Sequence, residues 1–351
     1  MTPPTQARQS ASVDLSALLA HYSELLQAEL HTMIQGTGDL RPFYGMMAYH
    51  MGWVDQAFVP VPARAGKSLR PALCLLLADG LGADPGACAP LAAGIEILHN
   101  FSLVHDDIED RSMTRRGRPT VWSIWGEAQA VNVGDGLFSL AHQLCLRAPL
   151  AQHQPAVFVP ILQSLERAII TLCEGQFLDM SGEGNLDLSS DAYLRMIARK
   201  TASLIGEAAW VGARVATDDP ATLDAARRFG VELGLAFQIR DDILGIWGDE
   251  GETGKSASSD IATRKMTLPI ILALEAGSDT LRARYGAPPQ DPDDEQQVRA
   301  LLEATGALQR TDAAEHVHWQ AAMEALDQMP LPADWRELVR HYARSFVERR
   351  A

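Results

Sequence analysis

Two acidic clusters are the residues of this chain best suited to chemistry. The first is Asp106-Asp107-Ile108-Glu109-Asp110, and the second, Asp241-Asp242, follows far downstream. On a helix, Asp106 and Asp110 lie one turn apart on the same face, where two carboxylates can share hard cations that one carboxylate would hold weakly. A second acidic pair on another helix would supply further carboxylate ligands to such cations.

Basic residues accompany both clusters. Arg115-Arg116-Gly117 follows the first, and Lys255 and Lys265 follow the second. A solvated acidic helix end that pairs with Arg115 and Arg116 would explain the first cluster taken alone. Because a second apolar helix ends in the same arrangement, the sequence favours a site for magnesium and diphosphate over that structural explanation.

Apolar residues at helical spacing predict the elements that must position these clusters. Strand signals are nearly absent, so we expect an all-α bundle whose central helices are apolar on most sides. The predicted helices cover 13–35, Leu69–Gly80, Ala87–Asp110, Ala128–Leu146, Ala156–Met180, Asp191–Val215 and Thr222–Trp247.

Three further segments complete the prediction. Residues 42–62 are expected to form a looser connection, and residues 181–190 a polar loop with a helix cap at Ser190 or Asp191. After the break marked by Pro288, Pro289 and Pro292, residues 293–350 are expected to form two or three more helices.

Composition excludes several other classes of protein. The net charge of −15 and pI near 5.1 argue against a nucleic-acid surface, which needs a broad basic patch. No CxxC pair occurs, which predicts neither a zinc site nor a disulfide framework but reduced, mostly buried thiols at Cys74, Cys88, Cys145 and Cys173.

The N-terminus carries no secretory signal, and the longest apolar runs are shorter than the roughly 20 residues needed to cross a bilayer. We therefore expect a cytoplasmic protein without a transmembrane segment. One domain is expected over 1–351, with 1–12 as a disordered tail.

Together, these motifs resemble those of the trans-isoprenyl diphosphate synthases, the head-to-tail prenyltransferases that include geranylgeranyl and farnesyl diphosphate synthases. The resemblance covers about residues 64–270, which form the motif-bearing core, whereas 271–351 carries few matching motifs. It implies a helical bundle around a central substrate cavity. It rests on the order and spacing of Gly66-Lys67-Ser68-Leu69-Arg70-Pro71, His99, the first acidic cluster with Arg115-Arg116-Gly117, Gly175-Gln176, Lys200-Thr201, Phe237-Gln238 and the second acidic cluster.

The resemblance implies a role for each charged residue. Asp106, Asp110 and Asp241 would bind about three Mg²⁺ ions that bridge the diphosphate of an allylic substrate. Asp107 and Asp242 belong to the same two catalytic motifs. Arg115, Lys200, Lys255 and Lys265 would stabilise the charge that grows on the leaving diphosphate. The allylic cation would be steadied by Lys200, Thr201 and Gln238, through oxygen dipoles or through contacts with the leaving group.

The resemblance also implies a second diphosphate pocket, which holds isopentenyl diphosphate without metal. Lys67, Arg70, His99 and Arg116 match that pocket. The guanidinium forks of Arg70 and Arg116 suit phosphate oxygens in bidentate fashion. Considered alone, a histidine on an apolar helix would more often be a core residue than a ligand.

The second motif departs from the family pattern. Gly245 stands where the family usually has a third aspartate, and glycine cannot bind metal. We expect activity with weakened metal affinity. Asp249, one turn further on, is a candidate substitute if the helix continues.

Residues below the first motif are expected to limit product length. Phe101 is the candidate floor, Ser102 leaves room one turn beneath Asp106, and Leu98 forms the next layer. This pattern resembles short-chain enzymes that make C20 products, with C15 as the next choice.

Three alternatives remain at the level of the sequence. A class I terpene cyclase shares the fold type and a metal-binding aspartate motif but has no need of a second diphosphate pocket. A regulatory subunit would keep the fold and pair with an active synthase, and a plain helical scaffold would leave the paired motifs unexplained. By resemblance alone, we expect a homodimer formed through helices near the first motif.

Overall fold

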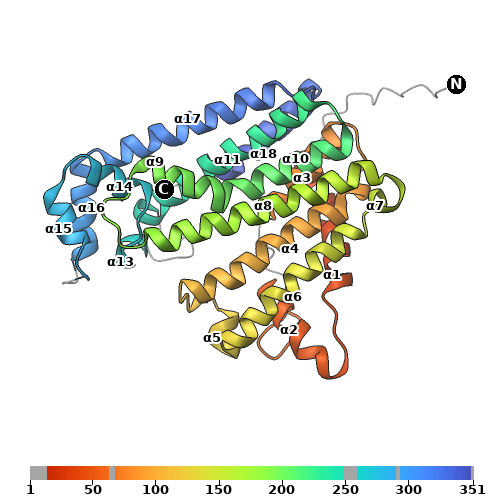
Figure 1. The fold of residues 1–351 in the computed structure, drawn as a ribbon, viewed down its shortest axis with the longest axis horizontal. Helices are drawn as coiled ribbons and strands as arrows, with labels where there is room; N and C mark the ends of the chain where they lie inside the picture. Colours follow the sequence, from red (N-terminus) through yellow and green to blue (C-terminus); the bar gives the residue numbers. More distant parts are fainter. Residues whose placement is uncertain (1–13, 63–67, 249–258, 290–292, 349–351) are drawn as a thin grey trace.

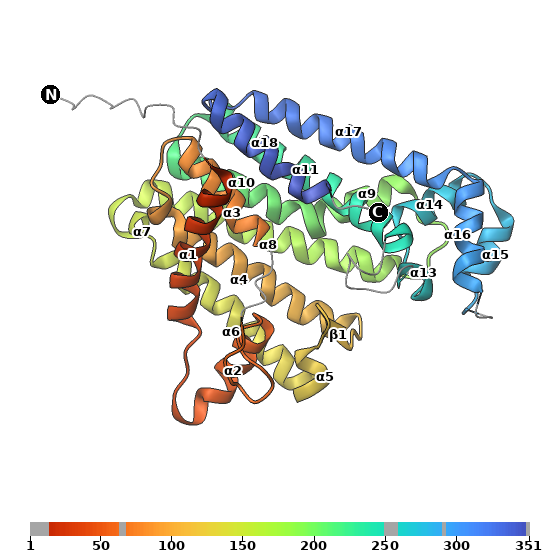
Figure 2. The same cartoon turned by 180° about the vertical axis from the view of Figure 1, so that it is seen from behind.

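The computed structural model describes residues 14–62, 68–248, 259–289 and 293–348. Within them the chain is almost entirely helical, which confirms the predicted all-α class. The long helices lie side by side, and the short helices α13 to α16 gather at one end of the bundle (Figures 1 and 2).

The first half of the chain forms α1 (Leu15–Met33), the 3-10 turn η1 (Gly38–Leu40), α2 (Arg41–His50), α3 (Leu69–Gly80), α4 (Pro85–Glu109), β1 (Thr114–Arg115), β2 (Arg118–Pro119), α5 (Val121–Trp125), α6 (Glu127–Leu146), α7 (Pro149–His153) and α8 (Pro155–Gly182). The second half forms α9 (Ser190–Ile197), the π-helical turn η2 (Ala198–Ala202), α10 (Ser203–Ala216), α11 (Pro220–Trp247), α13 (Ser259–Ala262), α14 (Leu268–Glu275), α15 (Asp279–Tyr285), α16 (Asp294–Ala304), α17 (Ala307–Asp327) and α18 (Ala333–Val347).

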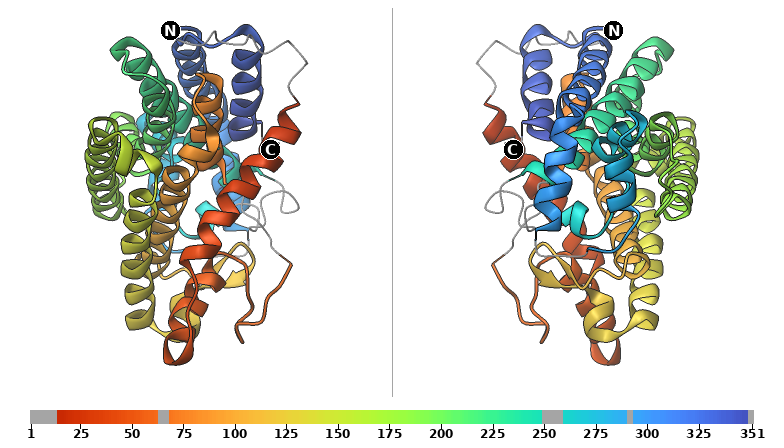
Figure 3. Two further views of the ribbon diagram at one scale, coloured as in Figure 1. Left: turned by 90° about the vertical axis from the view of Figure 1, so that its right-hand side faces the viewer. Right: turned by 90° about the vertical axis from the view of Figure 1, so that its left-hand side faces the viewer.

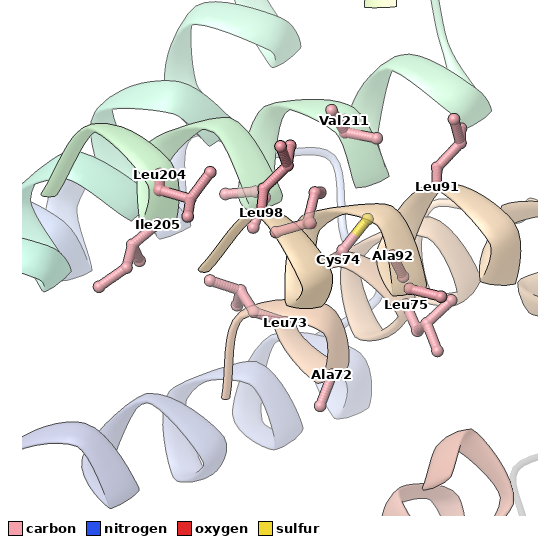
Figure 4. Packing of buried hydrophobic residues seen from close by; sticks show 14 of the residues in the cluster. Ala72, Leu73, Cys74, Leu75, Leu91, Ala92, Leu98, Leu204, Ile205 and Val211 are labelled. Carbon is pink, nitrogen blue, oxygen red and sulfur yellow. The ribbon is translucent and has the colours of Figure 1, made fainter. Parts of the chain in front are cut away.

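The main hydrophobic core forms where α3, α4 and α10 meet (Figure 4). Leu73 and Leu75 of α3 and Leu91 of α4 are fully buried there, because α3 is enclosed on most sides. Helix α1 packs on the outside of α3, α4 and α6 (Figure 3). The central helices are therefore apolar nearly all round, as a buried helix requires.

A second hydrophobic cluster surrounds α14, and α11 contributes to both clusters. Leu233 of α11 belongs to the main core, whereas Ile239 and Ile246 further along the same helix belong to the second cluster. The C-terminal part of α11, which carries Asp241-Asp242, is thus held from both sides.

Most predicted helices are confirmed to within a few residues, but two local predictions were wrong. Residues 41–50 form α2 rather than a loose connection, because Pro42 occupies the first turn of the helix, where proline starts a helix instead of breaking it. The cap of α9 is Ser189, whose Oγ accepts a hydrogen bond from the Ala192 amide, and not Ser190 or Asp191.

The segment predicted as one helix over Asp191–Val215 is divided by η2. Two glycines allow neighbouring helices to approach this π-helical turn. A Cβ on Gly175 of α8 would lie 2.2 Å from the Lys200 amide nitrogen, and one on Gly234 of α11 would lie 2.6 Å from the Ala202 Cα. The turn that carries Lys200 and Thr201 is therefore clamped between α8 and α11 by close backbone contact.

A hairpin that the sequence did not predict follows α4. Strands β1 and β2 pair Arg115 with Arg118 around the two-residue turn Arg116-Gly117. Both turn residues have positive φ, 53° and 71°, as a type I′ turn requires. The turn places Arg116 beside the end of α4.

The cysteine prediction is confirmed, since all four are free and only Cys173 is exposed. Within the described residues, two helices are long and apolar enough to cross a membrane by length and composition. In α4 the apolar stretch is mostly buried in the bundle, whereas in α8 much of it lies on the surface.

Candidate active site

The first acidic motif forms the C-terminal end of α4. Asp106 lies one turn before Asp110, whose amide donates to the Asp106 carbonyl. Burial raises the pKa of Asp106; Lys200 opposes that shift and Asp110 adds to it. Since the C-terminal end of a helix is itself negative, these carboxylates strongly favour nearby positive charge.

Lys200 supplies part of that charge from η2. Its Nζ donates to Asp179 Oδ2 of α8 at 2.5 Å and lies 3.9 Å from Asp106 Oδ1. Lysine and both carboxylates are largely shielded from water. The ammonium is therefore held at the edge of the first motif by a carboxylate that sequence reasoning did not single out.

Asp107 faces away from this edge and into the protein. Its Oδ1 accepts from Arg115 Nε at 2.8 Å, and only 2% of the side chain is exposed. Burial raises the pKa of Asp107 to about 6 although Arg115 opposes the shift. Asp107 thus fixes the hairpin arginine beside the carboxylates of α4.

Asp242 of the second motif is buried in a hydrogen-bond network. Its Oδ2 accepts from the Tyr193 hydroxyl at 2.6 Å and from the Leu268 amide, and its Oδ1 accepts from Gln238 Nε2 at 3.1 Å. Burial raises the pKa of Asp242 to about 7, while the bonds from Tyr193 and Gln238 oppose the shift. This carboxyl therefore ties α9, α11 and α14 together.

Gln238 extends the network toward η2. Its Oε1 accepts a hydrogen bond from Thr201 Oγ1 at 2.8 Å. The structure thus brings together Thr201, Gln238 and Asp242, which the sequence singled out separately. Asp241, the neighbour of Asp242, is only partly buried.

Lys265 connects the two acidic motifs electrostatically. Loss of hydration acts to lower the pKa of its ammonium, but Asp260, Asp179, Asp242 and Asp110 together raise it. Because Asp110 belongs to α4 and Asp242 to α11, one lysine senses carboxylates of both motifs. Carboxylates of both motifs therefore act on the same ammonium group.

The donor set fits magnesium. Asp106, Asp110 and Asp241 offer carboxylate oxygens, the ligand type that Mg²⁺ prefers. Among the described residues, no three His, Cys, Asp or Glu side chains already form a close ligand group.

A second, basic group lies beside α4 in the direction of α3 and the hairpin. Burial lowers the pKa of Arg70 to about 10, although Glu96 opposes the shift, and burial also lowers the pKa of Arg116. Burial and these arginines hold the pKa of His99 well below its usual value, so the imidazole is neutral. The buried Arg70 Nε has no hydrogen-bond partner among the described residues. Donors without acceptors, next to several positive charges, suit an anion.

His50 of α2 joins this basic group and was missed, because its segment was predicted as a loop. It lines a cavity of about 230 Å³ together with Arg115, Arg116 and Arg118. Its Nε2 atom is buried without a partner in the described part of the chain. Other neighbours that no motif revealed are Glu96, Asp179 and Tyr193.

The candidate chain-length residues lie on different sides of α4. Leu98 and Phe101 are buried, and the Phe101 ring meets Phe138 of α6 edge-on at a centroid distance of 5.3 Å. Ser102 Oγ donates to the His99 carbonyl within the helix. Lys67, Lys255 and Asp249, which the sequence also singled out, lie outside the described residues.

The His50 environment predicts a specific loss of stability in acid. Burial, then Arg115 and Arg116, lower the pKa of His50 from 6.5 to about 3. Between these values the unfolded chain binds a proton that the folded protein does not, so the stabilisation is present above pH 6.5 and is lost as the pH falls. We expect His50→Gln to reduce the drop in unfolding free energy between pH 7 and pH 4.5 by about 1–2 kcal/mol.

Urea unfolding at the two pH values measures this difference. His341→Gln, at an exposed position of α18, is the matched control and should follow the wild type. Parallel pH dependence of the wild type and His50→Gln would contradict the assignment.

Comparison with known proteins gives the family. Residues 51–305 match the profile described as polyprenyl synthetase. A geranylgeranyl diphosphate synthase of Mycobacterium tuberculosis (strain ATCC 25618 / H37Rv) is 40% identical over 301 residues, covering 85% of this chain and 84% of that protein. A (2E,6E)-farnesyl diphosphate synthase of the same strain is 35% identical over 341 residues, covering 95% and 92%.

Solved structures agree with this assignment. The crystal structure of a polyprenyl synthetase from Streptomyces coelicolor A3(2) is similar with a TM-score of 0.87 at 36% identity, covering 95% of this chain and 100% of that one. That of a geranylgeranyl pyrophosphate synthetase from Pyrococcus horikoshii Ot3 has a TM-score of 0.85 at 31% identity, covering 95% and 99%. By sequence over most of its length and by fold, this chain belongs to the polyprenyl synthetase family.

Proposed function

We propose that this chain is a single-domain, magnesium-dependent synthase that condenses isopentenyl diphosphate with an allylic diphosphate to give a short trans-prenyl diphosphate, C20 first and C15 next. The observation that carries the proposal is the presence of two separate charged sites along α4. One is the carboxylate end at Asp106 and Asp110, and the other is the basic group around His99. Two sites of opposite charge suit two diphosphates, one bound through metal and one bound directly.

The metal would be held by Asp106, Asp110 and Asp241, with about three Mg²⁺ ions expected from the family resemblance. When bound, Mg²⁺ would neutralise the diphosphate of the allylic substrate and favour its departure. Burial, with a smaller contribution from Asp110, raises the pKa of Asp106, and a bound cation would oppose both effects.

Fixed cations of the chain would stabilise the departing diphosphate. Arg115 and Lys200 are oriented in advance by Asp107 and Asp179, so little reorganisation is needed as charge grows on the leaving group. Lys265 adds a third positive charge between the two motifs, and Lys255 is proposed for the same role by resemblance.

Arg70, His99 and Arg116, with Lys67 by resemblance, would bind isopentenyl diphosphate. The unpartnered Arg70 Nε supplies a donor for a phosphate oxygen. Neutral His99 can donate one ring N–H without adding another charge to a crowded basic group. An incoming diphosphate would offset the mutual repulsion of these arginines.

The reaction proceeds in three steps. The allylic carbon–oxygen bond breaks and its electron pair leaves with the diphosphate. The double bond of isopentenyl diphosphate then attacks the allylic cation, and a proton is lost to the released diphosphate. Thr201 and Gln238, fixed by their bond to each other and to Asp242, would present oxygen dipoles to the cation. The reaction would also need apolar walls that exclude water, since water would convert the cation to an alcohol.

The basic group around Arg70 and His99 favours condensation over cyclisation. A terpene cyclase acts on one diphosphate and has no use for a second anion pocket. A regulatory subunit is less well supported, because Asp106, Asp110 and Asp241 are all retained.

Incubation of the purified protein with labelled isopentenyl diphosphate, Mg²⁺ and, separately, C5, C10 and C15 allylic diphosphates tests the proposal. We expect one main product of C20, or C15, after dephosphorylation, and loss of product when EDTA removes the metal. A cyclic hydrocarbon, or no condensation with any primer, would overturn the proposed function.

Phe101 is proposed as the floor for the growing chain, and its removal should lengthen the product. Its ring packs edge-on against Phe138 of α6. We expect Phe101→Ala to shift the main product upward by at least one C5 unit, measured by chromatography of the dephosphorylated prenols. Phe158→Ala, in α8 far from the motifs, is the control, and an unchanged length with Phe101→Ala would place the floor elsewhere.

A homodimer is proposed because α8 leaves apolar side chains in water. Ile170 and Phe177 are both more than half exposed and border a groove of about 640 Å³. Burial of this face by a second copy would remove that cost. We also propose that the protein is cytoplasmic and can be purified without detergent. Light scattering of the purified protein should give about twice the chain mass of 38.2 kDa.

Ile170→Asp should shift this mass toward that of the monomer, whereas Val317→Asp, on an exposed position of α17, should not. A monomeric wild type would refute the dimer.

A further inference from the structure

Lys265 follows α13 through a type of turn in which glycine is the usual residue. The Arg264 amide donates to the Ile261 carbonyl at 3.0 Å, and the Lys265 amide donates to the Asp260 carbonyl at 2.9 Å. These two bonds form a Schellman motif, which ends a helix with one residue in the left-handed region. That residue is Arg264, whose φ is 55°. The conformation of Arg264 therefore sets the direction in which Lys265 leaves the helix.

Any residue other than glycine is strained in this region. The β-carbon of an L-residue comes too close to the following carbonyl oxygen, whereas glycine has no β-carbon. Strained residues persist only where the surrounding structure holds them, and they cluster at functional sites. Arg264 directly precedes the lysine on which carboxylates of both acidic motifs act. The contacts of Arg264 must therefore offset the strain of the turn.

The Arg264 side chain is anchored at three points. Its Nε donates to the Ala287 carbonyl at 3.0 Å, and its Nη1 donates to the Ile261 carbonyl at 3.3 Å. Its Nη2 lies 2.7 Å from Asp294 Oδ2. The guanidinium carbon also lies 5.2 Å from the centre of the Tyr285 ring, within the range of a cation–π contact. Only 15% of the side chain is exposed, so water competes little for these contacts.

Asp294 supplies the charge of this anchor from α16. Its side chain is 2% exposed, and its Oδ1 accepts from Arg284 Nη1 of α15 at 2.7 Å, so one buried carboxylate lies between two guanidinium groups. The Tyr285 hydroxyl donates to the Lys265 carbonyl at 2.6 Å from the same side. Three short helices, α13, α15 and α16, thus meet around the turn at one end of the bundle (Figure 1).

We propose that Asp294 and Arg264 are positioning residues for Lys265. Their buried ion pair holds Arg264 in the left-handed turn, and the turn directs the lysine toward the diphosphate of the allylic substrate. This inference rests on the proposed function, because Lys265 has its role at the leaving diphosphate only there. It also gives α16, in a part of the chain that carries few of the sequence motifs, a role in the active site.

Glycine and alanine at position 264 distinguish this role from simple packing. Both substitutions remove the guanidinium and all its contacts. Glycine adopts a positive φ without strain, whereas alanine keeps the β-carbon and favours the right-handed region. If the ion pair acts through the turn, Arg264→Ala should displace Lys265 and Arg264→Gly should not. For the same reason, Arg264→Gly should suppress the defect of Asp294→Asn.

Five variants test the proposal: Arg264→Ala, Arg264→Gly, Asp294→Asn, the double variant Asp294→Asn/Arg264→Gly, and Arg282→Ala. The last removes an arginine of α15 that pairs with Asp187 on the surface, and it is the control. The first readout is the steady-state kinetics with each of the two substrates varied in turn. The second is the rise in melting temperature that Mg²⁺ with inorganic diphosphate produces, which needs no turnover. Melting in EDTA checks that each variant folds.

We expect Arg264→Ala and Asp294→Asn each to lower kcat/KM for the allylic diphosphate about 10-fold, since a small displacement of a positioned group can have an effect of this size. Both should also reduce the diphosphate-dependent rise in melting temperature. The KM for isopentenyl diphosphate should stay unchanged, because that substrate is assigned to the basic group beside α4. Arg264→Gly, the double variant and Arg282→Ala should resemble the wild type.

A Lys265→Met background tests whether the effect passes through the lysine. In that background Arg264→Ala should cause no further loss of kcat/KM for the allylic diphosphate. If Arg264→Ala fails to fold, Asp294→Asn with and without Arg264→Gly makes the same comparison.

The inference is overturned if Arg264→Gly is as weak as Arg264→Ala, if Arg264→Ala and Asp294→Asn behave like Arg282→Ala, or if Arg264→Ala weakens Lys265→Met further. A wild type that shows the diphosphate-dependent stabilisation without making a prenyl product would refute the proposed function and leave the thermal comparison of the variants intact. A wild type with neither response would overturn both.

Discussion

Negative charge gathered at the ends of two apolar helices is the constraint to which the rest of the site responds. The ends of α4 and α11 carry carboxylates where the helix dipoles are already negative, and burial raises the cost further. Each nearby element places a cation close to these carboxylates. The hairpin provides Arg115, η2 provides Lys200 and the turn after α13 provides Lys265. Carboxylates of both motifs act on Lys265 as well.

The fold meets this constraint through close backbone contacts. Gly175 and Gly234 let α8 and α11 approach the backbone of η2 from two sides. Hydrogen bonds to Asp179 of α8 and Gln238 of α11 then fix the side chains of Lys200 and Thr201. A π-helical turn in such a place is commonly functional, because the widened turn re-aims side chains that a regular helix would point elsewhere. Asp242 also holds neighbouring elements in place, because its three hydrogen bonds join α9, α11 and α14.

Sequence alone predicted the parts of the site that lie within one helix. The spacing of Asp106 and Asp110, and the long apolar helices that carry them, follow from periodicity and need no tertiary information. The contributions from other elements could not be predicted in this way. Asp179 and His50 reach the site by tertiary packing. Helix α2 was missed because Pro42 was taken as part of a loose connection rather than as a first-turn residue.

Helix α4 sets the geometry between the two proposed diphosphate sites. His99 and Asp106 are seven residues apart, which places them nearly on one face, two turns or about 10 Å apart. Since α4 is one continuous helix over this stretch, its register fixes that distance. Ser102 shares the face of Asp106, whereas Phe101 is rotated well away toward α6, where it meets Phe138. A hydrocarbon chain that descends from the first motif past Ser102 would meet this pair of rings where it turns toward α6. If the proposed floor is correct, product length would then depend on the spacing of α4 and α6 as well as on the residues of α4.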